Sequence, residues 1–156
     1  PIADIAAPSR PVAFEMLARW RHPALGEVPP DAFIPVAERG GLCLALDEAA
    51  LEAATRLLPR LPEGARRLAV NVTPSSLLLP GALARLDALL AAFGPGFDPA
   101  ALCLELTERV LAQEPDLLRD VARELLTRGV CLALDDFGEG QASLGVLAEI
   151  PFTCVK

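Results

Sequence analysis

The sequence predicts an α/β domain in which parallel strands form a barrel enclosed by helices. Short apolar runs typical of buried strands alternate with longer segments whose apolar residues recur every third or fourth position, as on a helix. Strands that alternate with helices indicate crossover connections and a parallel sheet. The expected strands are residues 12–20, 68–73, 102–107, 130–135 and 152–155.

Amphipathic helices are expected between these strands. One is predicted over residues 46–58, and a short one over residues 32–38. Gly129 is placed as the C-terminal cap of the last helix, just before the fourth strand. The apolar stripes of the two remaining helices are Leu83, Leu86, Leu90 and Phe93, and Leu118, Val121, Leu125 and Leu126.

The two faces of the strands differ in character. Alternate residues of a strand point to the same side, and Leu and Val occupy one side. The small and polar residues fall on the other: Ala69, Asn71, Cys103 and Glu105. This pattern is typical of a TIM-like (β/α)8 barrel, which has its chemistry at the carboxyl ends of the strands. An open doubly wound sheet would also place a site there, but no glycine-rich phosphate loop follows any strand.

Composition excludes several classes of protein. A chain of 156 residues with 53% hydrophobic and 22% charged residues is sufficient for one domain and too apolar for disorder. No apolar run is long enough to span a membrane and no leader is recognised, so a soluble, cytoplasmic chain is expected. The net charge of −7 argues against a nucleic-acid polymer as partner. Four cysteines without a CxxC pair are expected to be buried, reduced thiols: Cys43, Cys103, Cys131 and Cys154.

Oxygen-bearing side chains interrupt four of the strands. These are Glu15, Asn71, Glu105 and Asp135. Mg²⁺ and Mn²⁺ prefer carboxylate and amide oxygens, and the adjacent Asp136 could reach a second ion. Two such ions clamp the attacking and leaving oxygens of a phosphodiester displacement. A single acid at a strand end also serves as a helix cap or loop anchor, so both interpretations stay open at this point.

Five motifs then occur in order. They are Phe14-Glu15-Met16-Leu17-Ala18-Arg19-Trp20 with the following Arg21-His22-Pro23 and residues 33–38, Val70-Asn71-Val72-Thr73, Glu105-Leu106-Thr107-Glu108, Asp135-Asp136-Phe137-Gly138, and Lys156. Their order and intervals resemble the EAL domain family of cyclic di-GMP phosphodiesterases, with Met in place of the middle Ala of the name motif. The resemblance extends from Pro1 to Lys156.

The resemblance implies a role for each matching residue. Glu15, Asn71, Glu105 and Asp135 correspond to the ligands of Mg²⁺ or Mn²⁺, and Asp136 to a catalytic residue that reaches the second metal.

The remaining matches lie around this set. Lys156 corresponds to the lysine that helps orient the hydrolytic water, and Arg19 to a contact with a substrate phosphate. Leu17 is assigned to the substrate site with Arg19. Glu108 corresponds to the anchor of the loop that follows residues 135–138.

The implied activity is metal-dependent hydrolysis of cyclic di-GMP to linear pGpG in bacterial signal transduction. An alternative is an inactive receptor that binds the dinucleotide, because the family's TGYSSL loop reads Glu139-Gly140-Gln141-Ala142-Ser143-Leu144 here. A third is a folding fragment that binds nothing. Expected partners are cyclic di-GMP, a second copy in a homodimer, and a flanking sensory or GGDEF-type domain in the parent protein. Tethering of the parent protein to a membrane is left as an open alternative.

The length bears on how much of the barrel is expected. A complete barrel takes about 250 residues, so residues 1–156 should hold about six of eight strands and lack the edge of the first strand and the last strands. This chain alone is therefore expected to be inactive. Trp20 is expected in the core. The alternative is that Trp20 or Phe33 stacks on a guanine base. His22 is expected in a turn.

Overall fold

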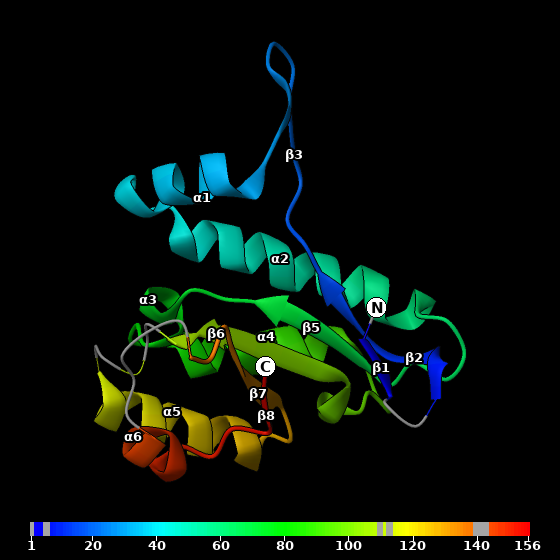
Figure 1. The fold of residues 1–156 in the computed structure, drawn as a ribbon, viewed down its shortest axis with the longest axis vertical. Coiled ribbons are helices and arrows are strands. Elements are labelled where there is room, and N and C mark those ends of the chain that lie inside the picture. Colours follow the sequence, from blue (N-terminus) through cyan, green and yellow to red (C-terminus); the bar gives the residue numbers. More distant parts are fainter. Residues whose placement is uncertain (1, 5–6, 109–110, 112–113, 139–143) are drawn as a thin grey trace.

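A curled sheet organises the fold. The computed structural model describes residues 2–4, 7–108, 111, 114–138 and 144–156, so the altered loop at residues 139–143 lies outside the described residues. The sheet has six strands in the order β1-β2-β5-β6-β7-β8 (Figure 1). Five are parallel, and β1 is an antiparallel edge strand. The strands are β1 (Ile2–Asp4), β2 (Ala7–Met16), β5 (Arg67–Asn71), β6 (Leu102–Thr107), β7 (Cys131–Asp135) and β8 (Cys154–Val155).

Helices connect the parallel strands, as the alternating pattern predicts. The three long helices are α2 (Cys43–Leu57), α4 (Ala82–Ala92) and α5 (Pro115–Thr127). The shorter elements are α1 (Pro30–Arg39), η1 (Leu58–Arg60), α3 (Pro74–Leu77), η2 (Pro99–Ala101) and α6 (Leu144–Glu149). α1 lies on α2, on the side away from the sheet (Figure 1).

The end of α5 follows the predicted glycine cap. Gly129 has a φ of +78°, and its N–H donates to the carbonyl of Leu126, while Val130 donates to the carbonyl of Leu125. The left-handed backbone is accessible to glycine without strain, so the chain can reverse directly into β7.

The two faces of the sheet carry different side chains, as expected. Aliphatic residues on the outer face pack under the helices, and Leu104, Leu132 and Leu134 are almost completely buried there. The inner face carries a separate cluster of small residues. Its members are Ala69, Cys103, Cys131 and Ala133.

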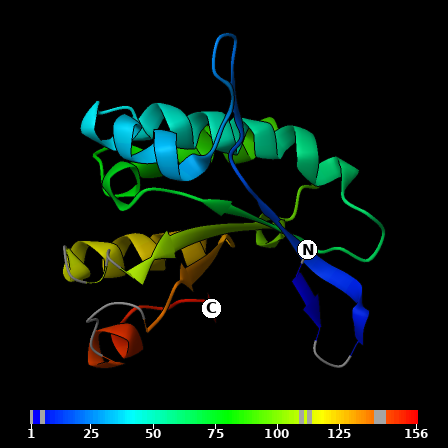
Figure 2. The same cartoon turned by 45° about the horizontal axis from the view of Figure 1, so that its top comes forward.

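The first expected strand is wrong at its end. β2 stops at Met16, and residues 17–19 leave the sheet before the hairpin of β3 (Trp20–His22) and β4 (Gly26–Val28) begins. The hairpin projects away from the sheet (Figures 1 and 2). Arg19 therefore does not share a strand face with Glu15.

Two side chains of this hairpin have defined expectations, Trp20 in the core and His22 in a turn. Trp20 is 44% exposed, which contradicts the expected core position. Its ring lies edge to face against the rings of Phe33 and His22, with centroids 5.8 and 5.4 Å apart. His22 is a turn residue as predicted, since its Nδ1 accepts from the N–H groups of Ala24 and Leu25.

The cysteines are free but unequally buried. Cys103 and Cys131 lie in the interior, Cys43 is half-buried, and Cys154 is exposed. The expectation of four buried thiols is therefore wrong for Cys154. Within the described residues, its strand β8 is the last strand of the sheet and pairs with β7 alone.

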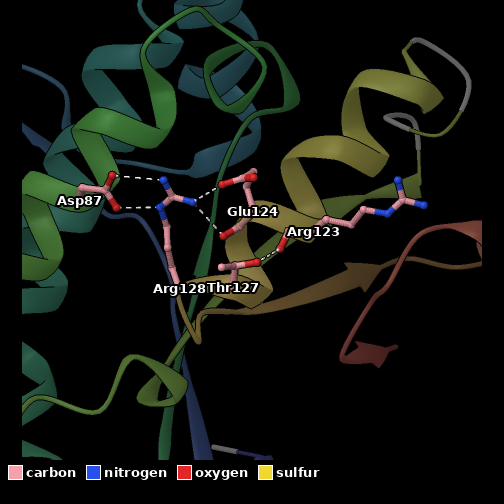
Figure 3. A network of polar contacts seen from close by, with 5 residues as sticks. All are labelled: Asp87, Arg123, Glu124, Thr127 and Arg128. Carbon is pink, nitrogen blue, oxygen red and sulfur yellow. Dashed lines mark hydrogen bonds and ion pairs between the residues drawn. The ribbon is translucent and has the colours of Figure 1, made fainter.

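A polar network joins neighbouring helices on the outside of the barrel. Arg128, just after α5, donates from Nε to Oδ1 of Asp87 at 2.7 Å and from Nη2 to Oδ2 at 3.2 Å (Figure 3). Its Nη1 also reaches Oε2 of Glu124 at 2.6 Å. The guanidinium thus fixes α4 against α5 with a planar fork, although its exposure to solvent limits the gain in stability.

The long helices are shorter than a membrane span requires. Within the ranges that the structure describes, none combines the necessary length with sufficient apolar character to cross a bilayer.

Thiol labelling tests the unequal burial. Desolvation, reinforced by the neighbouring Cys131, raises the pKa of Cys103 to about 12, so on the order of one molecule in 10,000 is a thiolate there at pH 8. We expect Ellman's reagent to modify Cys154 rapidly in the folded protein, and Cys103 and Cys131 only after unfolding in urea. Cys154→Ser should remove the fast phase; equally fast labelling of Cys103 would contradict the buried inner face.

Candidate functional site

The carboxyl ends of the parallel strands bring four predicted residues together. Glu15 is next to last in β2, Asn71 ends β5, Glu105 lies in β6 and Asp135 ends β7. In the strand register Asn71 is opposite Glu105, while Thr107 is opposite Asp135. Parallel pairing therefore places chemistry-bearing residues from four distant segments at one edge of the sheet.

Three of these residues form a carboxylate cluster. One oxygen each from Glu15, Glu105 and Asp135 lies within 4.8 Å of the others. Asn71 joins this cluster through its Nδ2, which donates to Oε1 of Glu15 at 3.0 Å. The arrangement concentrates negative charge and presents oxygen donors, which are the ligands that hard divalent cations prefer.

Lys156 supplies a positive charge to the cluster. Its Nζ forms a short ion pair with Oε1 of Glu105 and lies 3.8 Å from Oε2 of Glu15. Its backbone N–H donates to the carbonyl of Leu134 at 2.9 Å, and its carbonyl accepts from Phe137 at 3.1 Å. The main chain of Lys156 is thus held by β7 and by the turn that follows.

Burial and charge shift the pKa values of this ion pair. Glu105 is 1% exposed, and desolvation raises the pKa of its carboxyl. Lys156 opposes that rise, whereas Glu15 and Asp135 add to it. For Lys156, burial alone would lower the pKa, but the hydrogen bond and charge of Glu105 and the charges of Asp135 and Glu15 raise it overall.

One oxygen of the cluster is unsatisfied. Oε2 of Glu105 is buried and has no hydrogen-bond partner in the part of the chain that the structure describes. A buried carboxylate oxygen without a partner carries a desolvation cost that a cation would remove. The donor set and this unpaired oxygen both fit a divalent metal ion.

Two further predicted residues border the cluster. Asp136 follows β7, is exposed and has a φ of +56°, and it lies outside the group of three converging carboxylates. Glu108 is buried just after β6, and its Oε2 accepts from the backbone N–H of Gly138 at 2.8 Å. Glu108 therefore connects the end of β6 to the turn after β7.

The two residues assigned to substrate follow the end of β2. Leu17 and Arg19 are exposed in the segment between β2 and β3. Among the described residues, the hydrogen bond of Arg19 is local, from Nη1 to the carbonyl of Ala18 at 2.8 Å. Arg19 lines a hollow of about 400 Å³ together with Trp20 and Pro30.

Asp47 is a buried polar residue near the site that the sequence motifs do not include. This residue of α2 is 7% exposed, and its Oδ2 accepts from the backbone N–H and the hydroxyl of Thr73 at 2.7 and 2.8 Å, and from the hydroxyl of Ser76. A detectable signal was present, since Asp47 interrupts an apolar stripe at helical spacing that includes Leu44 and Leu51.

Comparisons with known proteins agree with this architecture. The family model described as EAL domain matches residues 1–156. The chain is 31% identical over 157 residues to the bifunctional diguanylate cyclase/cyclic di-GMP phosphodiesterase MucR of Pseudomonas aeruginosa, covering 97% of this chain and 22% of that protein. It is 38% identical over 151 residues to an uncharacterized signaling protein of Caulobacter vibrioides, covering 97% of this chain and 18% of that protein.

Solved structures of EAL proteins have the same fold as this chain. The PaMucR phosphodiesterase in complex with c-di-GMP superposes with a TM-score of 0.81 at 30% identity, over 90% of this chain and 57% of that one. The FimX EAL domain from Pseudomonas aeruginosa bound to c-di-GMP gives 0.80 at 24% identity, over 90% and 56%, and shows the fold. These similarities confirm the predicted TIM-like α/β barrel of EAL type, of which the described parallel strands form a curled part.

The chain spans about a fifth of the length of the curated relatives that it matches. The family match nevertheless extends over every residue from 1 to 156, and the polar residues at the strand ends occupy the order that the motifs predicted. The chain belongs to the EAL domain family.

Proposed function

We propose that this chain provides the metal-binding edge of a bacterial signalling phosphodiesterase that hydrolyses cyclic di-GMP to linear pGpG. The observation that carries the proposal is the carboxylate cluster of Glu15, Glu105 and Asp135, with its buried, unpaired Glu105 oxygen. The MucR relative, named as a cyclic di-GMP phosphodiesterase, supports the choice of substrate.

Mg²⁺ or Mn²⁺ is the cofactor that these residues would hold. Glu15, Glu105 and Asp135 offer carboxylate oxygens, and Asn71 offers its amide oxygen while its Nδ2 holds Glu15 in place. Asp136 is the nearby carboxylate that we assign to a second ion. When bound, divalent ions supply Lewis-acid stabilisation of the charge that develops on the phosphodiester.

Lys156 acts in this proposal as a hydrogen-bond donor. Its raised pKa keeps the ammonium group protonated at neutral pH, so it can orient an attacking water but cannot take a proton from it. Its contacts with Glu105 and Glu15 place the N–H donors of the ammonium group beside the carboxylate cluster.

Arg19 and Leu17 form the proposed contact with substrate. The guanidinium of Arg19 has one local hydrogen bond among the described residues, so its other N–H groups are available for a phosphate, which a planar fork recognises well. Leu17 offers exposed apolar surface two residues earlier. Glu108 anchors the turn after β7 through Gly138.

A nucleotide receptor without activity is the second candidate. The altered sequence of residues 139–144 favours it, because the corresponding family loop has a different set of side chains. The presence of Glu15, Asn71, Glu105 and Asp135 together at one edge of the sheet favours the enzyme.

The wider context is also proposed. Because the chain spans about a fifth of its curated relatives, we place it in a longer protein with a sensory or GGDEF-type domain, able to form a homodimer. We propose the cytoplasm as its compartment, since reducing conditions would keep Cys103 and Cys131 as thiols.

Hydrolysis by the full-length gene product tests the proposal directly. With Mg²⁺ or Mn²⁺, we expect chromatography to show conversion of cyclic di-GMP to pGpG, and no appreciable turnover by the 156-residue chain alone. Glu15→Gln should lower the rate by about 100-fold or more, because the neutral amide is a weaker ligand and the partner of Asn71 changes.

A matched control is available on α2. Glu52→Gln alters an exposed carboxylate that pairs with Arg56, so the rate should stay near that of the unaltered protein. Binding of the dinucleotide without linear product under either metal would reject the enzyme and leave the receptor.

Replacement of the lysine should separate metal binding from turnover. Lys156→Met removes the charge that lowers the pKa of Glu105, so that pKa should rise further. Protons then compete with the metal for Glu105 at a higher pH than before. On acidification, Mn²⁺ binding should therefore be half lost at a higher pH than in the unaltered protein. We expect paramagnetic resonance titrations from pH 8 to 5 to show this shift, with turnover abolished at pH 8; an unchanged midpoint would contradict the coupling of Lys156 to Glu105.

A further inference from the structure

A buried carboxylate outside the carboxylate cluster holds the turn that follows Asn71. Asp47 lies in α2 and is 7% exposed, and one of its oxygens, Oδ2, accepts hydrogen bonds from three donors. Two of the donors belong to Thr73 and the third to Ser76. A charge that is buried in this way requires such bonds, because water no longer solvates it.

The partners of Asp47 form the start of α3. Thr73 is the residue before α3, yet its hydroxyl does not cap that helix and donates to Asp47 instead. The hydroxyls of Thr73 and Ser76 also lie 2.9 Å apart. The turn between β5 and α3 is therefore held from outside, by a side chain of α2.

Asn71 lies two residues before this anchored point. The intervening Val72 continues the pairing with β6, since its N–H donates to the carbonyl of Glu105 at 3.0 Å. Asn71 is thus fixed by the sheet and by the Asp47 turn, and in this position its Nδ2 reaches Oε1 of Glu15.

We propose that Asp47 is a positioning residue that fixes Asn71, and through Asn71 also Glu15, in the geometry that binds the metal. The inference rests on the proposed function of the carboxylate cluster. Asp47 touches none of the cluster residues through its hydrogen bonds in the described part of the chain, so its influence runs through Thr73. Groups that orient metal ligands in this way typically change affinity by about 10- to 100-fold when removed.

A metal-free measurement tests the positioning itself. In ¹⁵N spectra of the 156-residue chain, the side-chain amide signal of Asn71 can be assigned from its absence in Asn71→Ala. We expect Asp47→Ala to move this signal toward the position of a solvent-exposed amide, because the turn that holds Asn71 is released. The matched control is Asp87→Ala, which removes a carboxylate tie between α4 and α5 and should leave the signal unchanged.

Mn²⁺ titrations of the same variants test the consequence for the site. Asp47→Ala should weaken Mn²⁺ binding about 10-fold or more at a temperature where circular dichroism shows a folded chain, whereas Asp87→Ala should not. Asp47→Asn should restore the Asn71 signal and most of the affinity, because its amide oxygen can accept from the same donors.

Each alternative outcome has a distinct meaning. An unchanged Asn71 signal together with unchanged affinity in folded Asp47→Ala would overturn the proposal and leave Asp47 a purely structural group. Equal losses of affinity in the Asn and Ala variants, with the Asn71 signal unmoved in both, would also overturn it, because the negative charge alone would then act. Should Asp47→Ala not fold, Thr73→Val takes its place and must move the Asn71 signal.

Failure of the proposed function is recognised separately. It would appear as the absence of Mn²⁺ binding by the unaltered chain, or as binding that Glu15→Gln does not weaken. The metal-free Asn71 signal still decides the role of Asp47 in that case.

Discussion

Mutual repulsion among three carboxylates at one edge of a parallel sheet is the constraint around which this site is arranged. At a separation of 4.8 Å, the upper limit for the three oxygens, and an effective dielectric constant of about 20, each pair of charges would cost about 3.5 kcal/mol. Glu105, which is 1% exposed, meets this repulsion with the least access to water. Desolvation and this repulsion both raise the pKa of the Glu105 carboxyl, and the charge of Lys156 opposes that rise. The chain as a whole carries a net charge of −7 and offers little further compensation.

The scaffold brings these charges together through side-chain size and hydrogen bonds. Small residues such as Ala69 and Ala133 line the inner face, and the bulky side chains of the same strands pack outward under the helices. Hydrogen bonds from outside the cluster then hold the ends of the strands. Asp47 anchors the turn after β5, and Glu108 anchors the turn after β7 through Gly138. The chemistry-bearing edge is therefore stabilised by groups that need not touch a metal.

The sequence predicts the parts of this structure that repeat locally. The strand at residues 102–107 has the predicted bounds, because a buried run with small residues on one face and leucines on the other leaves little choice. The sequence therefore predicts correctly that Glu105 lies on the inner face of the sheet, on the same side of the strand as Cys103. The convergence of Glu105 with Glu15 and Asp135 was expected from the same rule, since the carboxyl ends of parallel strands share an edge.

The errors arise where position depends on distant contacts. The apolar run continues past Met16 through Leu17 and Ala18, so it does not reveal that the chain leaves the sheet there and carries Arg19 and Trp20 outward. The exposure of Cys154 depends on the sheet partners of β8, which a single strand does not encode. Asp47 interrupts the apolar stripe of its helix, but this interruption does not reveal its partners, because Thr73 and Ser76 lie 26 and 29 residues further along the chain.

The same repulsion distinguishes the two candidate functions. Cyclic di-GMP carries two negatively charged phosphodiesters, so a sheet edge that presents Glu15, Glu105 and Asp135 would repel it in the absence of added positive charge. Lys156 balances one of the three carboxylates. A receptor that only binds the dinucleotide would gain affinity by neutralising the other two, whereas an enzyme needs them to hold the ions that stabilise the charge on the phosphodiester. A clustered set of carboxylates beside a protonated lysine is therefore the reason why we propose hydrolysis and not binding alone.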